Sequence, residues 1–328
     1  MGDITLSSAF ATSIDTPEHI RVAEQLGYER AWTYDSPALY PDVWGILYLA
    51  AERTETIGLG PAVLIPSLRH PMANAAAIAG LAALAPGRVA VALGSGFTGR
   101  YTLGHRPLRW AFVEEYVRAL HGLLAGETVE WEGRPIRMMH PDGFGAARPI
   151  DVPILLGADG PKGIAVAQAI GDGVFSAGAP SASGMEWQAL LQFGTVLDED
   201  ESMESERVLA AAGHGVAVLY HAVYERAGAA VDDFPGGAVW REALEQIPET
   251  ERHLATHDGH LVHLTDRDRA AIAAGGSALL PTLGLTGTAA QVRERVDQLA
   301  AAGVTEIAYQ PAGPDIPGEL ERLAAALR

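Results

Sequence analysis

Cysteine is absent from this chain of 328 residues, and its absence excludes several kinds of chemistry. The chain cannot form disulfides, bind a metal through thiolates or attack a substrate with a cysteine nucleophile. Lysine is almost absent too, because Lys162 is the only one and the other strongly basic residues are arginines. A Ser-His-Asp signature, a nucleophile elbow and a Walker loop are also missing, so the chemistries that use them are not indicated.

Long hydrophobic runs and a basic leader are missing as well. Residues 1–10 contain no positive stretch followed by an apolar one, and no apolar run is long enough to span a bilayer. The formal net charge of -18 repels phosphate backbones and anionic lipids, so nucleic acids and membranes are not expected as partners. We therefore expect a cytoplasmic protein that acts on a small-molecule or peptide substrate.

Short β-type runs alternate with amphipathic helical segments along most of the chain. This alternation predicts repeated βα units around a parallel sheet. The length suits one (β/α)8 TIM barrel with insertions, which is an α/β fold, and we expect a single domain over residues 1–328. The predicted strands are residues 4–8, 30–35, 57–64, 88–94, 153–157, 173–177, 187–198 and 304–309.

Helix ends are marked by residues that commonly cap them. Thr16 before Pro17 is typical of an N-cap, and Gly27 is typical of a C-terminal stop. Thr288 with Gln291 has the spacing of a capping box. These signals predict helices that begin near residues 16 and 288.

Three stretches interrupt the βα rhythm. Residues 126–149 contain a predicted hairpin excursion that turns at Gly133. The segment between the sixth and seventh strands is too short for a normal crossover, so either that helix is missing or the run at 187–198 is partly helical. Residues from about 230 to 285 are interpreted as an irregular helical insertion.

Small residues are common where the predicted strands end. In α/β barrels the carboxyl ends of the strands carry the chemistry, and small residues allow backbone to approach a flat ring system closely. A glycine at one such end is explained equally well by a turn, but the series of ends favours a planar cofactor. The ends are residues 7–8, 34–36, 60–63, 94–97, 157–161 and 176–178.

The run GADGPKG, residues 157–163, follows a strand and opens a helix. Backbone N–H groups and the helix dipole at such a position favour an anion. Lys162 is interpreted either as an added positive charge for that anion or as an exposed lysine in an ordinary turn. GSGF, residues 94–97, is not a dinucleotide fingerprint because it does not continue as GxGxxG into a helix.

Four histidines are closely spaced: His253, His257, His260 and His263. On a helix, His253 and His257 would share a face, which permits a metal pair. A glycine breaks the segment and no HExxH arrangement is present, so we expect a packed or solvated cluster and no metal site. One of these histidines remains a candidate proton donor.

At several of these segments the sequence resembles the luciferase-like superfamily, and within it the deazaflavin-dependent reductases. Within this group the sequence is similar to methylenetetrahydromethanopterin reductase and to glucose-6-phosphate dehydrogenase of the coenzyme F420 type. The resemblance covers roughly residues 1–180 and 284–312. Its carriers are AEQLGYERAWTYDS, TIGLGPAVLIPSLRHP, LAPGRVAVALGSG, PILLGADGPKGIAVAQAIGDGVFSAG and TGTAAQVRERVDQLAAAGVTEI.

The resemblance implies a deazaflavin across the barrel mouth, hydride transfer at its C5 position, a homodimer, and a cis peptide bond between Ala62 and Val63. It implies Asp35 as a catalytic residue, with Tyr34 and Tyr101 as candidate proton donors. The residues that it implies in cofactor binding are Ser8, Asp35, Ser36, Ala62, Val63, Gly94, Ser95, Gly96, Phe97, Gly157, Ala158, Asp159, Gly160, Pro161, Lys162, Ala177 and Gly178.

Two positions depart from the glucose-6-phosphate enzymes. Ser36 stands where those enzymes have a histidine, and Phe97 stands where they have a glutamate. Both missing groups serve acid–base chemistry, so a reductase that passes hydride from reduced F420 to a C=C or C=N acceptor fits better than sugar-phosphate oxidation. The alternatives are an FMN-dependent two-component monooxygenase or reductase, and a flavin-binding barrel without catalytic activity.

Overall fold

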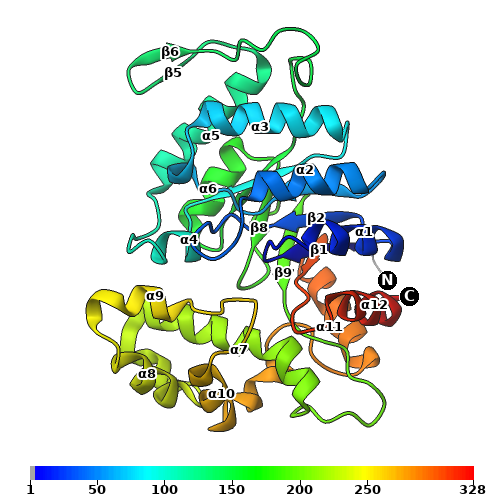
Figure 1. Cartoon of the computed structure of the whole chain (residues 1–328), viewed down its shortest axis with the longest axis vertical. Helices are drawn as coiled ribbons and strands as arrows, with labels where there is room; N and C mark the ends of the chain where they lie inside the picture. The colour runs from blue at the N-terminus through cyan, green and yellow to red at the C-terminus, as the bar shows by residue number, and fades with distance from the viewer. Residues whose placement is uncertain (1–3) are drawn as a thin grey trace.

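The central sheet consists of eight parallel strands, each four to six residues long, in the order β3-β2-β1-β10-β9-β8-β7-β4 (Figure 1). The structure, a computed structural model, describes residues 4–328. Nearly every strand residue is buried, because helices cover the outside of the sheet and side chains fill the inside. The strands are β1 (Thr5–Phe10), β2 (Arg30–Thr33), β3 (Gly58–Pro61), β4 (Val91–Gly94), β7 (Ile154–Gly157), β8 (Gly173–Ser176), β9 (Gln188–Gln192) and β10 (Glu306–Tyr309).

The two outer strands of this order, β3 and β4, meet at a seam that closes the sheet. Parallel bridges join Leu59 to Val89 and Leu64 to Leu93. The Leu59 N–H donates to the Arg88 carbonyl at 2.7 Å, and the Gly94 N–H donates to the Leu64 carbonyl at 3.1 Å. The predicted (β/α)8 barrel is therefore confirmed, and each observed strand overlaps its predicted range.

Between the two bridges the chain leaves the ladder as a bulge. The peptide bond between Ala62 and Val63 in this bulge is cis, which confirms the expectation from the resemblance. Gly60 permits the close approach at the seam, because a Cβ there would lie 1.9 Å from the Ala90 carbonyl oxygen. The Val63 side chain packs where a Cβ on Gly94 or Gly157 would lie, at 3.0 Å and 2.5 Å. Glycines on β4 and β7 thus make room for the bulge.

Seven helices around the barrel contact one another in the order α6-α5-α3-α2-α1-α12-α11. The ring is open between α6 and α11, because residues 177–187 contain no helix. The sixth crossover helix is therefore the one that is missing. The seven helices are α1 (Thr16–Leu26), α2 (Val43–Arg53), α3 (Pro71–Leu84), α5 (Trp110–Ala125), α6 (Pro161–Ile170), α11 (Ala289–Ala301) and α12 (Ile316–Leu327), and two short turns, η1 (Pro66–Leu68) and α4 (Thr98–Tyr101), follow β3 and β4.

The predicted helix caps are mostly correct. Thr288 and Gln291 form the capping box of α11, and Gly27 ends α1 in the left-handed conformation. The N-cap prediction for Thr16 is wrong, since α1 starts at Thr16 after the cap residue Asp15. The Thr16 Oγ1 instead accepts the N–H of Ser13 at 2.8 Å, so this oxygen is engaged upstream of the helix.

The hairpin excursion lies at one end of the molecule, beyond α3 and α5 (Figure 1). It pairs β5 (Val129–Trp131) with β6 (Arg134–Ile136). Glu132 and Gly133 form the turn with φ angles of 52° and 71°, so the turn falls at the predicted glycine. The Trp131 side chain packs edge-on against Tyr116 of α5 with ring centroids 5.6 Å apart, and this contact attaches the hairpin to the barrel helices.

A helical insertion between β9 and α11 forms the opposite end of the molecule (Figure 1). It begins at residue 206 rather than near 230, because α7 packs on the other insertion helices around a separate hydrophobic cluster that includes Val216, Tyr220 and Trp240. Its ends run side by side, with a parallel bridge between Val196 and Gly287. The elements are α7 (Glu206–Ala227), η2 (Gly228–Asp233), α8 (Gly237–Glu245), η3 (Glu249–Glu251), α9 (Arg252–Thr256), α10 (Asp266–Ala273) and η4 (Gly276–Thr282).

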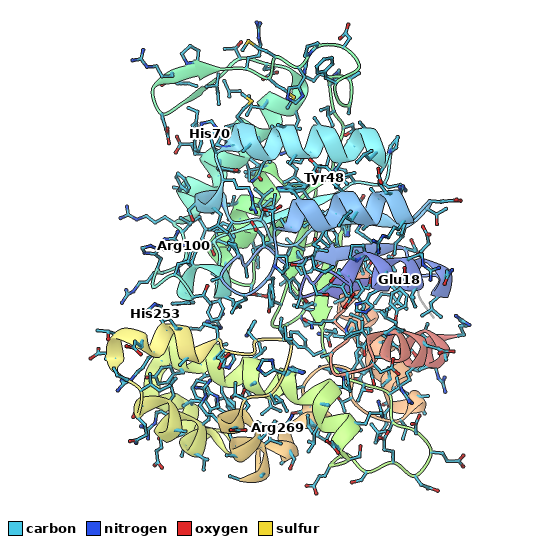
Figure 2. The ribbon with its side chains drawn as sticks, viewed as in Figure 1. Glu18, Tyr48, His70, Arg100, His253 and Arg269 are labelled. Carbon is cyan, nitrogen blue, oxygen red and sulfur yellow. The ribbon has the colours of Figure 1, made fainter. Side chains whose placement is uncertain are left out.

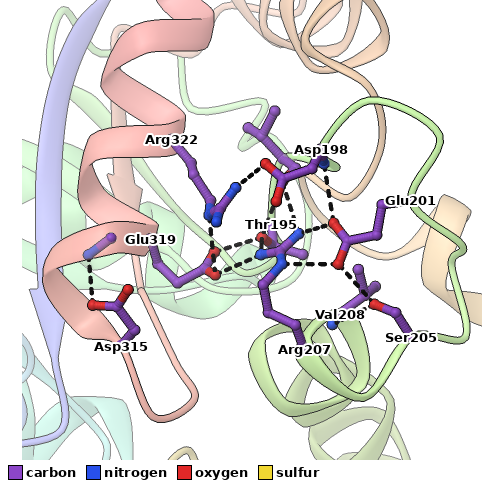
Figure 3. Close-up of polar contacts among 12 residues, drawn as sticks. Thr195, Asp198, Glu201, Ser205, Arg207, Val208, Asp315, Glu319 and Arg322 are labelled. Carbon is purple, nitrogen blue, oxygen red and sulfur yellow. Dashed lines mark hydrogen bonds and ion pairs between the residues drawn. The ribbon is translucent and has the colours of Figure 1, made fainter.

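Arg207 joins the insertion to the last barrel helix (Figure 3). Its guanidinium lies between Glu201 and Glu319, with the Nη1 atom 2.7 Å from the Glu319 Oε1 atom. Thr195 donates a hydrogen bond to the same Glu319 carboxylate. Burial raises the pKa of the Glu319 carboxyl, while the hydrogen bond from Thr195 and the charge of Arg207 oppose that shift. The network holds α7 against α12.

A second buried carboxylate lies at the amino end of the strands. Trp32 and Trp187 each donate an indole N–H to Glu306, to different carboxylate oxygens and both at 2.7 Å. The Arg30 guanidinium lies over both indole rings, 5.4 Å and 4.6 Å from their centroids. Strands β2 and β10 are thus linked inside the barrel, at the end opposite the mouth. Within residues 4–328, no helix is long and apolar enough to cross a membrane.

Gly60→Ala should lower the free energy of unfolding by about 1–3 kcal/mol, because the new methyl group overlaps backbone at the seam. Gly45→Ala is the matched control. Gly45 lies on the exposed side of α2, where the nearest atom to a new Cβ is 4.0 Å away, and alanine there should stabilise the chain by about 0.5–1 kcal/mol. Denaturant unfolding followed by circular dichroism measures both. A Gly60→Ala variant as stable as the parent would contradict the close approach at the seam.

Candidate functional site

The carboxyl ends of the strands form the barrel mouth, and the predicted site residues there divide into two groups. Those after β2 are buried: Tyr34, Asp35 and Ser36. Ser8 is buried too, but β1 continues to Phe10, so Ser8 lies within the strand opposite Ala31 and not at the carboxyl end predicted from the sequence. Those after β7 and β8 include exposed positions, namely Asp159, Gly160, Pro161, Lys162, Ala177 and Gly178. Val63, Ser95 and Phe97 lie between the groups and are half-buried. The structure thus gives the mouth a closed side at β1–β2 and an open side at β7–β8.

Asp35 occupies the closed side as one partner of an ion pair. The Arg69 Nη1 atom lies 2.7 Å from the Asp35 Oδ2 atom, and the Arg69 Nη2 atom lies 2.6 Å from the Asp42 Oδ2 atom. Asp42 also caps α2 by accepting the N–H groups of Trp44 and Gly45. Arg69 follows the seam bulge in the chain, so this pair ties the end of β2 to the segment after β3.

The electrostatics of Asp35 follow from its burial. Desolvation raises the pKa of this carboxyl above its ordinary value, although the hydrogen bond and charge of Arg69 oppose the shift. The sequence analysis missed Arg69, which stands in the quoted run TIGLGPAVLIPSLRHP. A buried aspartate requires a cation nearby, and that requirement was the signal that could have found it.

Tyr34 lies near Asp35 but points its hydroxyl elsewhere. The hydroxyl donates to the Gln310 Oε1 atom at 2.9 Å, and the Gln310 amide donates to the Leu261 carbonyl at 3.2 Å. Burial raises the pKa of the Tyr34 hydroxyl well above its ordinary value. Gln310, which directly follows β10, was not anticipated from the sequence.

The turn after β4 brings Phe97 and Tyr101 together. Their rings are 4.9 Å apart in an edge-to-face arrangement, and Tyr101 stacks on His257 at 6.4 Å. Burial raises the pKa of the half-buried Tyr101 hydroxyl. Ser36 contacts this turn, because a Cβ on Gly99 would lie 3.1 Å from its Oγ atom. The two positions that depart from the glucose-6-phosphate enzymes, Ser36 and Phe97, therefore flank the same turn.

Asp159 organises the open side of the mouth. Its Oδ1 atom accepts the N–H groups of Ala177 and Gly178 at 3.0 Å and 3.1 Å, so the carboxylate bridges the ends of β7 and β8. Gly160 is the cap residue of α6, and a Cβ there would meet no atom within 4 Å. Lys162 follows in the first turn and is exposed. The first N–H groups of α6 thus face open space beside a lysine.

A segment of the insertion, residues 257–263, lies across the closed side of the mouth. Tyr40, after β2, donates its hydroxyl to the His260 carbonyl. Leu261 is buried in the same hydrophobic cluster as Tyr34, Tyr40 and Ala62. The insertion therefore supplies part of the wall, a feature that strand-end patterns could not indicate.

The four closely spaced histidines at positions 253, 257, 260 and 263 do not form one cluster. His257 and His260 are buried, and they gather with His221 of α7 rather than with His253 or His263. Helix α9 ends at Thr256, before His257, so His253 and His257 do not share the face that a continuous helix would have given them. His253 faces the barrel beside Gly104, near the turn that carries Arg100 (Figure 2). The expectation of a packed cluster is correct for His257 and His260.

Comparison with known proteins identifies the family. The sequence profile of the luciferase-like monooxygenase family matches residues 9–306. The chain belongs to the luciferase-like monooxygenase family. The expectation of a redox enzyme of this superfamily is thereby confirmed.

Two kinds of curated relatives within the family are similar to this chain over different lengths. A 5,10-methylenetetrahydromethanopterin reductase from Methanopyrus kandleri is 27% identical, and the alignment covers 90% of this chain and 88% of that protein. An F420-dependent glucose-6-phosphate dehydrogenase from Beutenbergia cavernae is 34% identical, and the alignment covers 46% of this chain and 49% of that protein. The reductase likeness thus extends along nearly the whole chain, whereas the dehydrogenase likeness is limited to about half of it.

Solved structures agree with the fold. A coenzyme F420 dependent tetrahydromethanopterin reductase from Methanopyrus kandleri superimposes with a TM-score of 0.68 at 22% identity, and 99% of each chain is covered. The oxygenating constituent of a diketocamphane monooxygenase from Pseudomonas putida, in complex with FMN, superimposes with a TM-score of 0.63 at 13% identity, covering 99% of this chain and 98% of that one. At these identities the likeness establishes the fold alone.

Arg69→Met should destabilise the chain by about 3 kcal/mol at neutral pH, since it leaves the buried Asp35 carboxylate without a counter-charge. Loss of Arg69 raises the folded-state pKa of Asp35 further above the unfolded value. The loss of unfolding free energy in Arg69→Met should therefore be largest above the folded-state pKa of Asp35. It should become smaller as the pH falls and the Asp35 carboxyl is protonated. Unfolding by urea at a series of pH values measures it.

Two controls accompany this measurement. Asp35→Asn with Arg69→Met should remove most of the pH dependence, because no carboxyl remains at that position. Arg118→Met breaks the surface pair with Glu114 and should cost less than about 1 kcal/mol. If Arg69→Met and Arg118→Met lowered the free energy of unfolding equally at neutral pH, the ion pair between Arg69 and Asp35 would not be buried in solution.

Proposed function

We propose that this chain is an F420H2-dependent reductase that adds hydride to a C=C or C=N bond of a small-molecule or peptide substrate. The observation that carries the proposal concerns positions 35, 36 and 97, none of which offers a free base. Ser36 and Phe97 cannot accept a proton from an alcohol, and the Asp35 carboxylate is held by Arg69. Such a mouth suits delivery of hydride to an unsaturated acceptor better than oxidation of a hydroxyl group.

The residues of the mouth fit a long, flat cofactor with an anionic tail. Ala62 and Val63 form the bulge beneath the mouth. Gly94 on β4 and Gly157 on β7 have no side chains, so none projects beside the bulge. These residues, with Ser95 and Phe97, would contact the ring. When bound, the reduced deazaflavin supplies a hydride from its C5 position. Asp35 and Ser36 are buried on the closed side, where they would support the ring edge through the backbone. Ser8 lies within β1, and its hydroxyl donates to the Arg30 carbonyl, so it would not reach the ring edge.

The open side would hold the tail. The first N–H groups of α6 are free of helix partners, and the dipole of this ten-residue helix favours an anion there. Lys162 adds a positive charge that a phosphate can approach from solvent. Asp159 serves a different purpose, since its carboxylate fixes the loop containing Ala177 and Gly178. Gly157, Ala158 and Pro161 complete the turn.

A reduction also needs a proton. The Tyr34 hydroxyl is directed to Gln310, so its proton is held in the closed side. Tyr101 is half-buried at the edge of the mouth beside Phe97, and its hydroxyl is the better placed donor. We propose a homodimer as the working state, on the basis of the family resemblance.

Titration of the full chain with F420 and with FMN tests the proposal. Quenching of cofactor fluorescence should give micromolar or tighter binding for F420 and weaker binding for FMN. Reduced F420 should then be oxidised by the enzyme when α,β-unsaturated carbonyl or cyclic imine substrates are supplied. The alternative of an FMN-dependent monooxygenase is tested as well, because one protein of similar structure was solved in complex with FMN. Tight FMN binding with oxygen-dependent turnover would establish the monooxygenase alternative, and binding without turnover of either cofactor would leave a non-catalytic barrel.

Gly160→Asp should weaken F420 binding by about tenfold or more, because the carboxylate would face the cofactor phosphate at the helix N-terminus. Gly160→Asn adds the same bulk without the charge and should weaken binding much less, since the space around Gly160 is open. Equal affinity of the parent and Gly160→Asp would place the phosphate elsewhere.

A further inference from the structure

The insertion contains three buried histidines that the reaction proposed above does not use. His221 lies on α7, whereas His257 and His260 lie in the segment after α9. Their side chains are buried, with 1%, 0% and 8% of each residue exposed. One ring nitrogen from each lies within 4.8 Å of the others. The histidines come from two separate segments of the chain, and tertiary packing brings their rings to one point.

The hydrogen bonding of this group is incomplete. The His221 Nδ1 and His260 Nδ1 atoms are 3.1 Å apart, and the His260 Nε2 atom lies 3.4 Å from the Thr98 Oγ1 atom. In contrast, His221 Nε2 and both ring nitrogens of His257 are buried without a hydrogen-bond partner. Leaving a buried donor or acceptor unpaired costs about 1–3 kcal/mol for each group. The ring nitrogens of histidines in a protein core usually have hydrogen-bond partners. Three ring nitrogens of this group have none, so the group lacks a binding partner.

The spacing suits a metal ion. Two nitrogens bound to one tetrahedral ion at the usual Zn–N distance lie about 3.3 Å apart, close to the separation of His221 Nδ1 and His260 Nδ1. One ring nitrogen of His257 lies within 4.8 Å of a ring nitrogen of each of these two histidines, so an inward shift of the His257 ring completes a three-histidine set. Its Nε2 atom lies 3.7 Å from the Glu225 Oε1 atom. A carboxylate at the second nitrogen of a ligating histidine commonly orients the ring.

We propose that His221, His257 and His260 form a binding site for a divalent first-row transition metal of the Zn2+ class. Imidazole nitrogen is a preferred ligand of these ions, and the chain offers no thiolate that would compete. Glu225 acts as a positioning residue on His257. The site links α7 to the segment at 257–263, whose His260 and Leu261 carbonyls contact Tyr40 and Gln310 at the barrel mouth. Metal binding therefore holds the wall of the mouth in place. This departs from the expectation that the chain has no metal site, because His221 was not part of that reasoning.

Metal titration of the full chain tests the site without any cofactor or substrate. Protein stripped with a chelator should bind one equivalent of Zn2+ by calorimetry, and one equivalent of Co2+ with the visible absorption of a four- or five-coordinate ion. Bound Zn2+ should also raise the melting temperature. His221→Asn, His257→Asn and His260→Asn should each weaken binding by at least a hundredfold, and Glu225→Gln should weaken it about tenfold to a hundredfold.

Two control variants separate this site from incidental histidine binding. His214→Asn changes a buried histidine on the same helix but outside the group, and His263→Asn changes an exposed histidine on the same segment. Both should bind Zn2+ as the parent does. If a ligand variant fails to fold by circular dichroism, Cu2+ bound to the parent chain provides the second measurement, since nitrogen couplings in its electron paramagnetic resonance spectrum should indicate three imidazoles. Absence of stoichiometric metal, unchanged affinity in His221→Asn, or fewer than three coupled imidazoles would overturn the proposal.

Discussion

Closure of the barrel between β3 and β4 is the constraint on which the mouth depends. The two strands pair at Leu59 and again at Leu64, and between these bridges the chain must bulge. Gly60 allows the backbones to meet, and glycines on β4 and β7 receive Val63. The chain that leaves the seam carries Arg69 to Asp35, so an arrangement required for closing the sheet also fixes the carboxylate beside the mouth. The same short segment thus closes the sheet and positions this carboxylate.

The mouth is built from two sources with different tasks. The barrel supplies the low surface around the bulge and the open helix end at α6. The insertion supplies the opposite wall through Leu261, and it brings a group of histidines that is independent of the strand ends. Because the two parts are separate, the insertion can change without moving the seam or the helix end.

The parts that the sequence predicted correctly depend on local signals. Strand runs, the capping box at Thr288 and the turn at Gly133 are each encoded within a few residues, and the cis bond at Ala62–Val63 came from the family segment. The parts that were missed depend on contacts between distant residues. His221 and His260 are 39 positions apart, and Gln310 is 276 positions from its partner Tyr34. The start of the insertion was misplaced because the amphipathic pattern of α7 does not reveal whether its partner is the barrel or another helix.

The position of β1 has a consequence for the chain during synthesis. β1 pairs with β2 on one side and with β10 on the other, in the register of Thr5 with Glu306. On the ribosome, the growing chain can add strands in order from β1 to β9, but the edges of β1 and β9 stay unpaired until β10 emerges. Open strand edges promote association between chains. The net charge of the complete chain is -18, and mutual repulsion between such chains opposes association through their open strand edges.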